Sequence, residues 1–127
     1  MEVFPFIDRV VYINLNERTD RRAHIERELA TVFPPEKIMR FAAIKNRHGG
    51  VGCSQSHLAV LKIARKAGWR NVLVVEDDLV WQNTEIAGER FTSLAQKSYD
   101  VIVLAGTFVE CEPDTFRLRS CQSGTAY

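Results

Sequence analysis

The 127-residue sequence lacks any long hydrophobic run and any large excess of charge of one sign. No apolar stretch approaches the roughly 20 residues of a membrane-spanning helix, so no transmembrane segment is expected. The formal net charge is +1, which gives no argument for binding nucleic acid or a membrane surface. The first residues, up to Pro5, contain no basic segment followed by an apolar one, so we also expect no signal peptide.

Cysteine is scarce, with Cys53, Cys111 and Cys121 as its three occurrences. A small odd number favours reduced thiols and a cytoplasmic location. The alternative of a Cys111–Cys121 pair across a hairpin stays open. The sequence has no Cys-x-x-Cys or His-x-x-x-His spacing of the kind that indicates zinc.

Short apolar runs alternate along the chain with segments of helical spacing. The runs predict strands over 9–15, 38–44, 71–79, 99–106, 115–120 and 121–125, and the spacing predicts helices over 21–32, 53–68 and 84–96. Thr19 and Asn83 are suited to helix N-caps, and Gly68 is suited to a left-handed residue after a helix. The alternation predicts a single α/β domain over residues 1–127, with a mainly parallel sheet and flanking helices.

The most informative stretch is 71–79, where an apolar run ends in Glu76, Asp77 and Asp78. An unpaired buried charge costs several kcal/mol, so these carboxylates should lie where the strand leaves the core. In open α/β sheets that edge binds ligands. Strand alternation would direct Glu76 and Asp78 to the same side, as oxygen ligands for Mn²⁺ or Mg²⁺ shared with substrate phosphates. The alternative is a solvated acidic turn paired with Arg or Lys.

Basic residues follow the first predicted strand and should emerge at the same edge of the sheet. Arg18, Arg21 and Arg22 are suited to binding a pyrophosphate or to orienting an acidic metal ligand. The alternative is a solvated helix face on which Asp20 and Glu28 neutralise them.

The segment 46–52 contains three glycines and predicts a flexible loop before the second helix. The N-terminus of that helix is suited to an anion, but the segment lacks the Lys-Ser/Thr of a phosphate-binding loop. Ser56 and His57 follow in the first turns. A lone histidine there is more often a packing or hydrogen-bonding residue than a catalytic one.

Three segments together resemble glycosyltransferase family 25, which includes lipooligosaccharide-biosynthesis and collagen-galactosyltransferase-like proteins. They are VYINL with RTDRR in 11–22, GVGCSQSHL in 50–58 and VVEDDL in 74–79. Their order and spacing are similar to the family over about residues 9–80, and a weaker similarity extends to 124–127.

The resemblance implies a GT-A-like nucleotide-diphosphosugar fold. It implies transfer of a hexose, commonly galactose from UDP-galactose, to an acceptor such as a lipopolysaccharide or lipooligosaccharide saccharide, or hydroxylysine. The expected cofactor is Mn²⁺ or Mg²⁺ bound with the UDP-sugar donor. The expected roles fall on seven residues. Asp78 and Glu76 would bind the metal, Asp77 would support it or hold the ribose, and the nucleotide and its diphosphate would contact Asn14, Leu15, Arg18 and Arg21.

The chain is shorter than members of that family usually are. A C-terminal truncation that removes the acceptor side and a further metal ligand would explain this, and a short paralogue or a degraded relic of the family are the alternatives. An apolar edge at the last predicted strand would favour a homo-oligomer. Two other classes stay open: a non-catalytic nucleotide-sugar-binding or assembly module, and a metal-dependent phosphohydrolase. The expected location is the cytoplasm, or the periphery of a membrane at which the acceptor is made.

Overall fold

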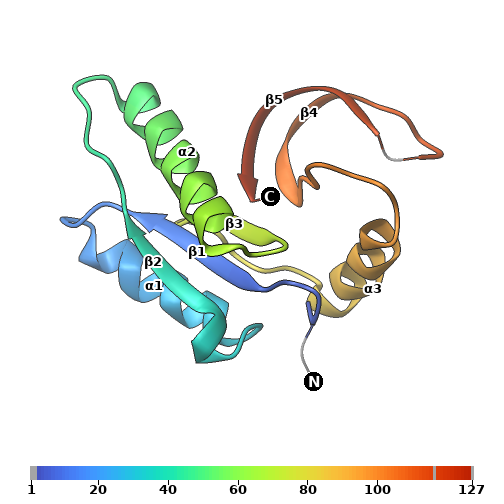
Figure 1. Ribbon diagram of the computed structural model, residues 1–127, viewed down its shortest axis with the longest axis horizontal. Helices are drawn as coiled ribbons and strands as arrows, with labels where there is room; N and C mark the ends of the chain where they lie inside the picture. Colours follow the sequence, from blue (N-terminus) through green and yellow to red (C-terminus); the bar gives the residue numbers. More distant parts are fainter. Residues whose placement is uncertain (1–2, 116, 127) are drawn as a thin grey trace.

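The apolar runs of the sequence form a five-stranded mixed sheet with three α-helices (Figure 1). The structure is a computed structural model and describes residues 3–115 and 117–126. The elements in chain order are β1 (Arg9–Asn14), α1 (Thr19–Ala30), the 3-10 turn η1 (Pro35–Lys37), β2 (Ile38–Ala42), α2 (Gly49–Ala67), β3 (Val72–Glu76), α3 (Thr84–Ala95), β4 (Ala105–Cys111) and β5 (Leu118–Ala126).

The sheet has the order β2-β1-β3-β5-β4. β1 lies between β2 and β3 and pairs in parallel with both, whereas β5 is antiparallel to β3 and to β4. The predicted α/β class is confirmed for the three parallel strands and the helices beside them. The described part of the chain contains no helix that combines the length and apolar character needed to cross a membrane.

Residues of β1 alternate between two hydrophobic clusters, one on each face of the sheet. Val10 belongs to the cluster that contains Leu29 of α1, and Val11 belongs to the cluster that contains Val60 of α2. Side chains alternate along a strand, and a strand covered on both faces needs apolar residues at every position. Helices α1 and α2 therefore cover opposite faces of the parallel strands (Figure 1).

The element boundaries differ from prediction at two helix starts. Arg18, and not Thr19, is the N-cap of α1. Helix α2 begins at Gly49, so the predicted glycine-rich loop is largely the first turn of a helix. Asn83 is the N-cap of α3 as predicted, with φ 51° and no side-chain capping bond, and Gly68 has the predicted left-handed conformation with φ 73°.

The strand predicted over 99–106 is wrong, because the chain forms no strand between 99 and 104 and enters β4 only at Ala105. The open edge of β3 is taken by β5, so this apolar segment has no strand partner. Tyr99, Ile102 and Leu104 instead line a cleft of about 320 Å³ with Phe91 of α3. Ile102 and Leu104 pack against the hydrophobic core without pairing with a strand.

The C-terminal strand is not an edge of the sheet. The two strands predicted over 115–120 and 121–125 form one strand, β5, which lies between β3 and β4. The expectation of an exposed edge at the last strand is therefore wrong. Self-association stays a prediction.

Candidate functional site

The carboxyl ends of β1 and β3 lie side by side, because the parallel register pairs Ile13 with Glu76. Asn14 and Asp77, the residues that follow this pair, also lie side by side. The Asn14 amide Nδ2 donates a hydrogen bond to Asp77 Oδ2 at 2.8 Å, and the two residues are only 1% and 8% exposed. A buried carboxylate needs such a donor, since an unpaired one would be strongly destabilising.

The Asn14 side chain is fully engaged by the residues around it. Its Nδ2 also donates to the Arg18 carbonyl at 3.1 Å, and its Oδ1 accepts bonds from Arg40 Nε at 3.2 Å and Nη2 at 3.1 Å. The amide thus links β1, β2, the turn after β1 and the turn after β3. Asn14 therefore positions the edge of the sheet and has little remaining capacity for a ligand.

The basic residues of this edge differ in how firmly they are held. Arg18 donates from Nε to Asp20 Oδ1 at 3.0 Å and from Nη2 to Asp20 Oδ2 at 2.8 Å. The guanidinium holds the pKa of the Asp20 carboxyl far below its usual range. Arg21 makes a longer contact, 3.4 Å from Nη1 to Asp77 Oδ1, and its side chain is 44% exposed. Arg22 pairs with Glu26 at 3.0 Å. Arg21 is therefore more available to a ligand than Arg18.

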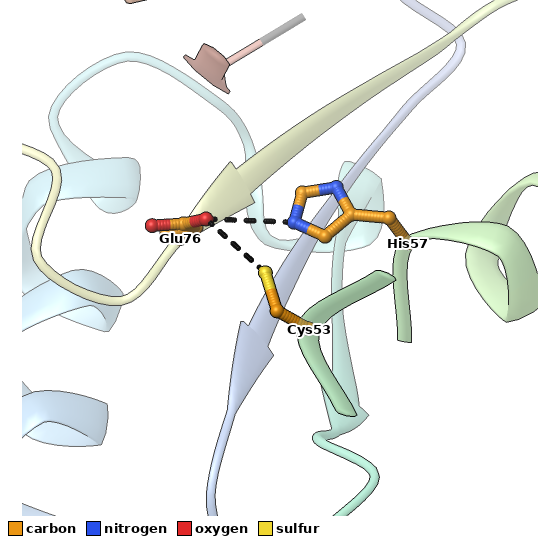
Figure 2. Close-up of side chains that lie close together, drawn as sticks. All are labelled: Cys53, His57 and Glu76. Carbon is orange, nitrogen blue, oxygen red and sulfur yellow. Dashed lines mark hydrogen bonds and ion pairs between the residues drawn. The ribbon is translucent and has the colours of Figure 1, made fainter. Parts of the chain in front are cut away.

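Glu76 faces helix α2 instead (Figure 2). Its Oε1 lies 3.5 Å from His57 Nε2 and 3.8 Å from Cys53 Sγ. One ligand atom from each of the three residues lies within 4.8 Å of the others. Cys53 is exposed as a residue, but partial desolvation of its thiol, followed by the charge of Glu76, raises the pKa of that thiol. The thiol is thus less ionised than usual, which argues against Cys53 as a nucleophile.

Helix α2 is brought to this position by close packing of its first turns. A Cβ on Gly52 would lie 2.6 Å from the Ile44 carbonyl oxygen, closer than real Cβ contacts allow. One turn later, the buried Ser56 hydroxyl accepts a bond from the Ile44 amide and donates to the Gly52 carbonyl, both at 2.8 Å. Gly52 and Ser56 therefore fix the segment before α2 against the helix. The family resemblance implies a supporting or structural role for Ser56, whereas the packing of Gly52 against Ile44 was not predicted from the sequence.

Asp78 is exposed and, within the described residues, makes no side-chain hydrogen bond or ion pair. It lies with Asp77 in a turn, since β3 ends at Glu76, so strand alternation does not govern where its side chain points. The chain beyond the turn is held on α1 by a 2.9 Å contact between His24 Nε2 and the Leu79 carbonyl. Leu15, at the end of β1, is half-buried.

The sequence reasoning missed the association of Cys53 with His57 and Glu76. The available signal was the spacing Cys-x-x-x-His in 53–57, which places two ligand side chains one turn apart on a helix. That spacing has many other uses, and the third member comes from a strand 19 positions after His57.

Comparisons of the chain with protein-family models, curated proteins and solved structures gave no match. The resemblance to glycosyltransferase family 25 therefore depends on the three segments of the sequence.

Proposed function

We propose that this chain is a nucleotide-sugar-binding domain of a hexosyltransferase similar to glycosyltransferase family 25. The proposed donor is a UDP-hexose, UDP-galactose first, and the proposed acceptor is a saccharide such as that of a lipooligosaccharide. The reaction would take place in the cytoplasm or at the periphery of the membrane where the acceptor is made.

One observation carries the proposal: the three segments that resemble the family meet at one edge of the sheet. Asn14 and Arg21 of the first segment contact Asp77 of the third. Cys53 and His57 of the second segment contact Glu76 of the third. Segments separated by tens of residues are thus brought to the carboxyl ends of parallel strands, where open α/β sheets bind nucleotides. A GT-A-like arrangement belongs to this proposal and would account for that convergence.

The acidic turn offers a donor set that fits Mn²⁺ or Mg²⁺. These ions prefer carboxylate oxygens and complete their coordination with water and substrate phosphates. Glu76 and Asp78 would hold the ion, whereas Asp77 is engaged by Asn14 and Arg21 and would position the turn. A bound divalent cation would neutralise charge on the departing nucleoside diphosphate.

The remaining site residues would contact different parts of the UDP-sugar donor. Arg21 is the favoured diphosphate contact, because it is exposed and held by a single 3.4 Å contact. Arg18 would first have to release Asp20, to which it donates two hydrogen bonds. Leu15, the residue after β1, would contact the nucleotide.

Calorimetry of UDP binding with and without Mn²⁺, followed by an acceptor-dependent UDP-release assay, tests the proposal. We expect UDP to bind only when the metal is present, and any turnover of UDP-hexose to require the acceptor. Binding of UDP without turnover of UDP-hexose would favour a non-catalytic nucleotide-sugar-binding module over a transferase. Acceptor-independent hydrolysis would favour a phosphohydrolase, and absence of any metal-dependent UDP binding would overturn the nucleotide site.

A further inference from the structure

Cys53, His57 and Glu76 converge on one point between helix α2 and the end of strand β3 (Figure 2). Cys53 and His57 lie one turn apart on the same face of α2, and Glu76 is the last residue of β3. Their contacts are loose for hydrogen bonds: the His57–Glu76 separation of 3.5 Å and the Cys53–Glu76 separation of 3.8 Å are both longer than an optimal bond between such groups.

The same separations suit three ligands around one tetrahedral ion. Zinc bond lengths place a nitrogen and an oxygen ligand about 3.4 Å apart, and a sulfur and an oxygen ligand about 3.6 Å apart. The observed values are 3.5 Å for His57 Nε2 to Glu76 Oε1 and 3.8 Å for Cys53 Sγ to Glu76 Oε1. The third separation, between sulfur and nitrogen, is at most 4.8 Å and would shorten to about 3.6 Å if both atoms bound the same ion.

Charge and access also suit a divalent cation. A thiolate, a carboxylate and a neutral imidazole together balance the charge of the ion, whose binding releases the thiol proton. Cys53 is exposed, and the side chains of His57 and Glu76 are 14% and 32% exposed, so an ion can reach the site from solvent. Sulfur and nitrogen donors select zinc or a similar transition metal over Mn²⁺ and Mg²⁺.

We propose that Cys53, His57 and Glu76 form a binding site for Zn²⁺ or a similar ion, with the fourth coordination position open to solvent. Three protein ligands with an open position leave room for a water molecule or for an oxygen atom of a bound ligand. The ion also ties α2 to the end of β3.

This inference does not depend on the proposed function, although the two sites share Glu76. The zinc site requires Cys53 and His57 and needs no nucleotide, whereas the proposed nucleotide site requires Asp78. Substitution of Cys53 or His57 therefore tests the zinc site alone, and substitution of Asp78 tests the nucleotide site alone.

Titration of the metal-free, reduced chain with Co²⁺ tests the proposal. We expect one equivalent of Co²⁺ to produce the near-ultraviolet charge-transfer absorption of a cobalt–thiolate bond, and Zn²⁺ to abolish it by displacement. Cys53→Ser should remove the band. His57→Ala should weaken Zn²⁺ affinity by more than about 100-fold, beyond the loss caused by removing a partner that only orients a ligand. Cys111→Ser, at an exposed free thiol, is the matched control and should leave the band unchanged.

A second measurement on the unaltered chain covers the case in which Cys53→Ser does not fold. Zn²⁺ should slow alkylation of Cys53 by at least about tenfold, since a coordinated thiolate is protected, and should leave Cys111 unaffected. Asp78→Asn, which lies outside the zinc site, should leave the cobalt–thiolate band unchanged. A folded chain with no cobalt–thiolate band, a band that survives Cys53→Ser, or equal protection of Cys111 would overturn the zinc site.

Discussion

The side chain of Asn14 donates a 2.8 Å hydrogen bond to Asp77 in the interior of the protein, across 63 positions of sequence. Each of the two side chains satisfies the hydrogen-bonding requirement of the other. The carboxylate obtains a donor where water is excluded, and the amide, which also binds Arg40 and the Arg18 carbonyl, is satisfied on both sides. This contact joins the first and third segments of the family resemblance.

Asn14→Ala should destabilise the protein by about 2–4 kcal/mol, because it leaves the buried Asp77 carboxylate without its main donor. Denaturant unfolding monitored by circular dichroism measures the loss. Asn16→Ala is a suitable control, since Asn16 is exposed and accepts a bond from the same Arg40 side chain. Equal effects of the two substitutions would show that Asn14 has no special role at the edge.

Asp78→Asn should abolish Mn²⁺-dependent UDP binding. It should change stability by no more than about 0.5 kcal/mol, as expected at an exposed position whose side chain has no bonded partner among the described residues. Asp77→Asn is the matched comparison and should lower the free energy of unfolding, because Asp77 is buried and bonded to Asn14. Calorimetry with Mn²⁺ and UDP measures the binding. An unaltered affinity in folded Asp78→Asn would remove Asp78 from the metal site.

Arg21→Lys should weaken binding of UDP by about tenfold and leave uridine binding nearly unchanged, because lysine does not reproduce the two-pronged contact of a guanidinium with phosphate. Arg18→Lys should weaken UDP binding less, since Arg18 is already held by Asp20. Arg22→Lys is the control, as Arg22 pairs with Glu26. Equal weakening of uridine and UDP would indicate a structural role for Arg21.

Gly52→Ala should cost about 1–3 kcal/mol, because the added Cβ would lie 2.6 Å from the Ile44 carbonyl oxygen and must displace backbone. Gly50→Ala, two positions earlier in the same helix, meets nothing within 4 Å. It should be neutral or stabilising by up to about 1 kcal/mol through helix propensity. Thermal unfolding of the two variants checks the contrast, and a Gly52→Ala protein as stable as the Gly50→Ala protein would contradict the packing.

Asp8 should make stability fall at acidic pH. Three donors of Arg70 hold its carboxylate, with the closest contact at 2.7 Å, and the side-chain bond to Arg70 is the main cause that lowers the pKa of Asp8 in the folded state. A carboxyl group with a lower pKa when folded contributes stability above its unfolded pKa near 3.9, and that stability is lost as pH falls through the folded value.

Urea unfolding at neutral pH and at about pH 3 measures this contribution. Asp8→Asn should reduce the difference in midpoint between the two conditions. High salt should also reduce it, because the Arg70 side chain is 82% exposed and its charge is screened. A pH dependence identical in the variant would show that Asp8 has the same pKa in the folded and unfolded states.

Local patterns in the sequence determined most of the secondary structure around the site. The apolar run before Glu76 predicted β3, because a strand buried on both faces tolerates few polar residues. Gly68 marked the end of α2, since a left-handed backbone favours glycine. The position of the acidic residues at the end of a strand also followed from sequence, because buried charges need partners.

Tertiary structure alone decided which partner each acidic residue has. Asp77 is bound to Asn14, Glu76 lies against Cys53 and His57, and Asp78 remains exposed. It also decided that β5 occupies the edge of β3, which left the apolar segment 99–104 without a strand partner. These outcomes depend on hydrogen bonds and packing between segments far apart in the chain. Residue type and local periodicity fix the conformation of a segment, but they carry no information on which distant segment offers the better contact.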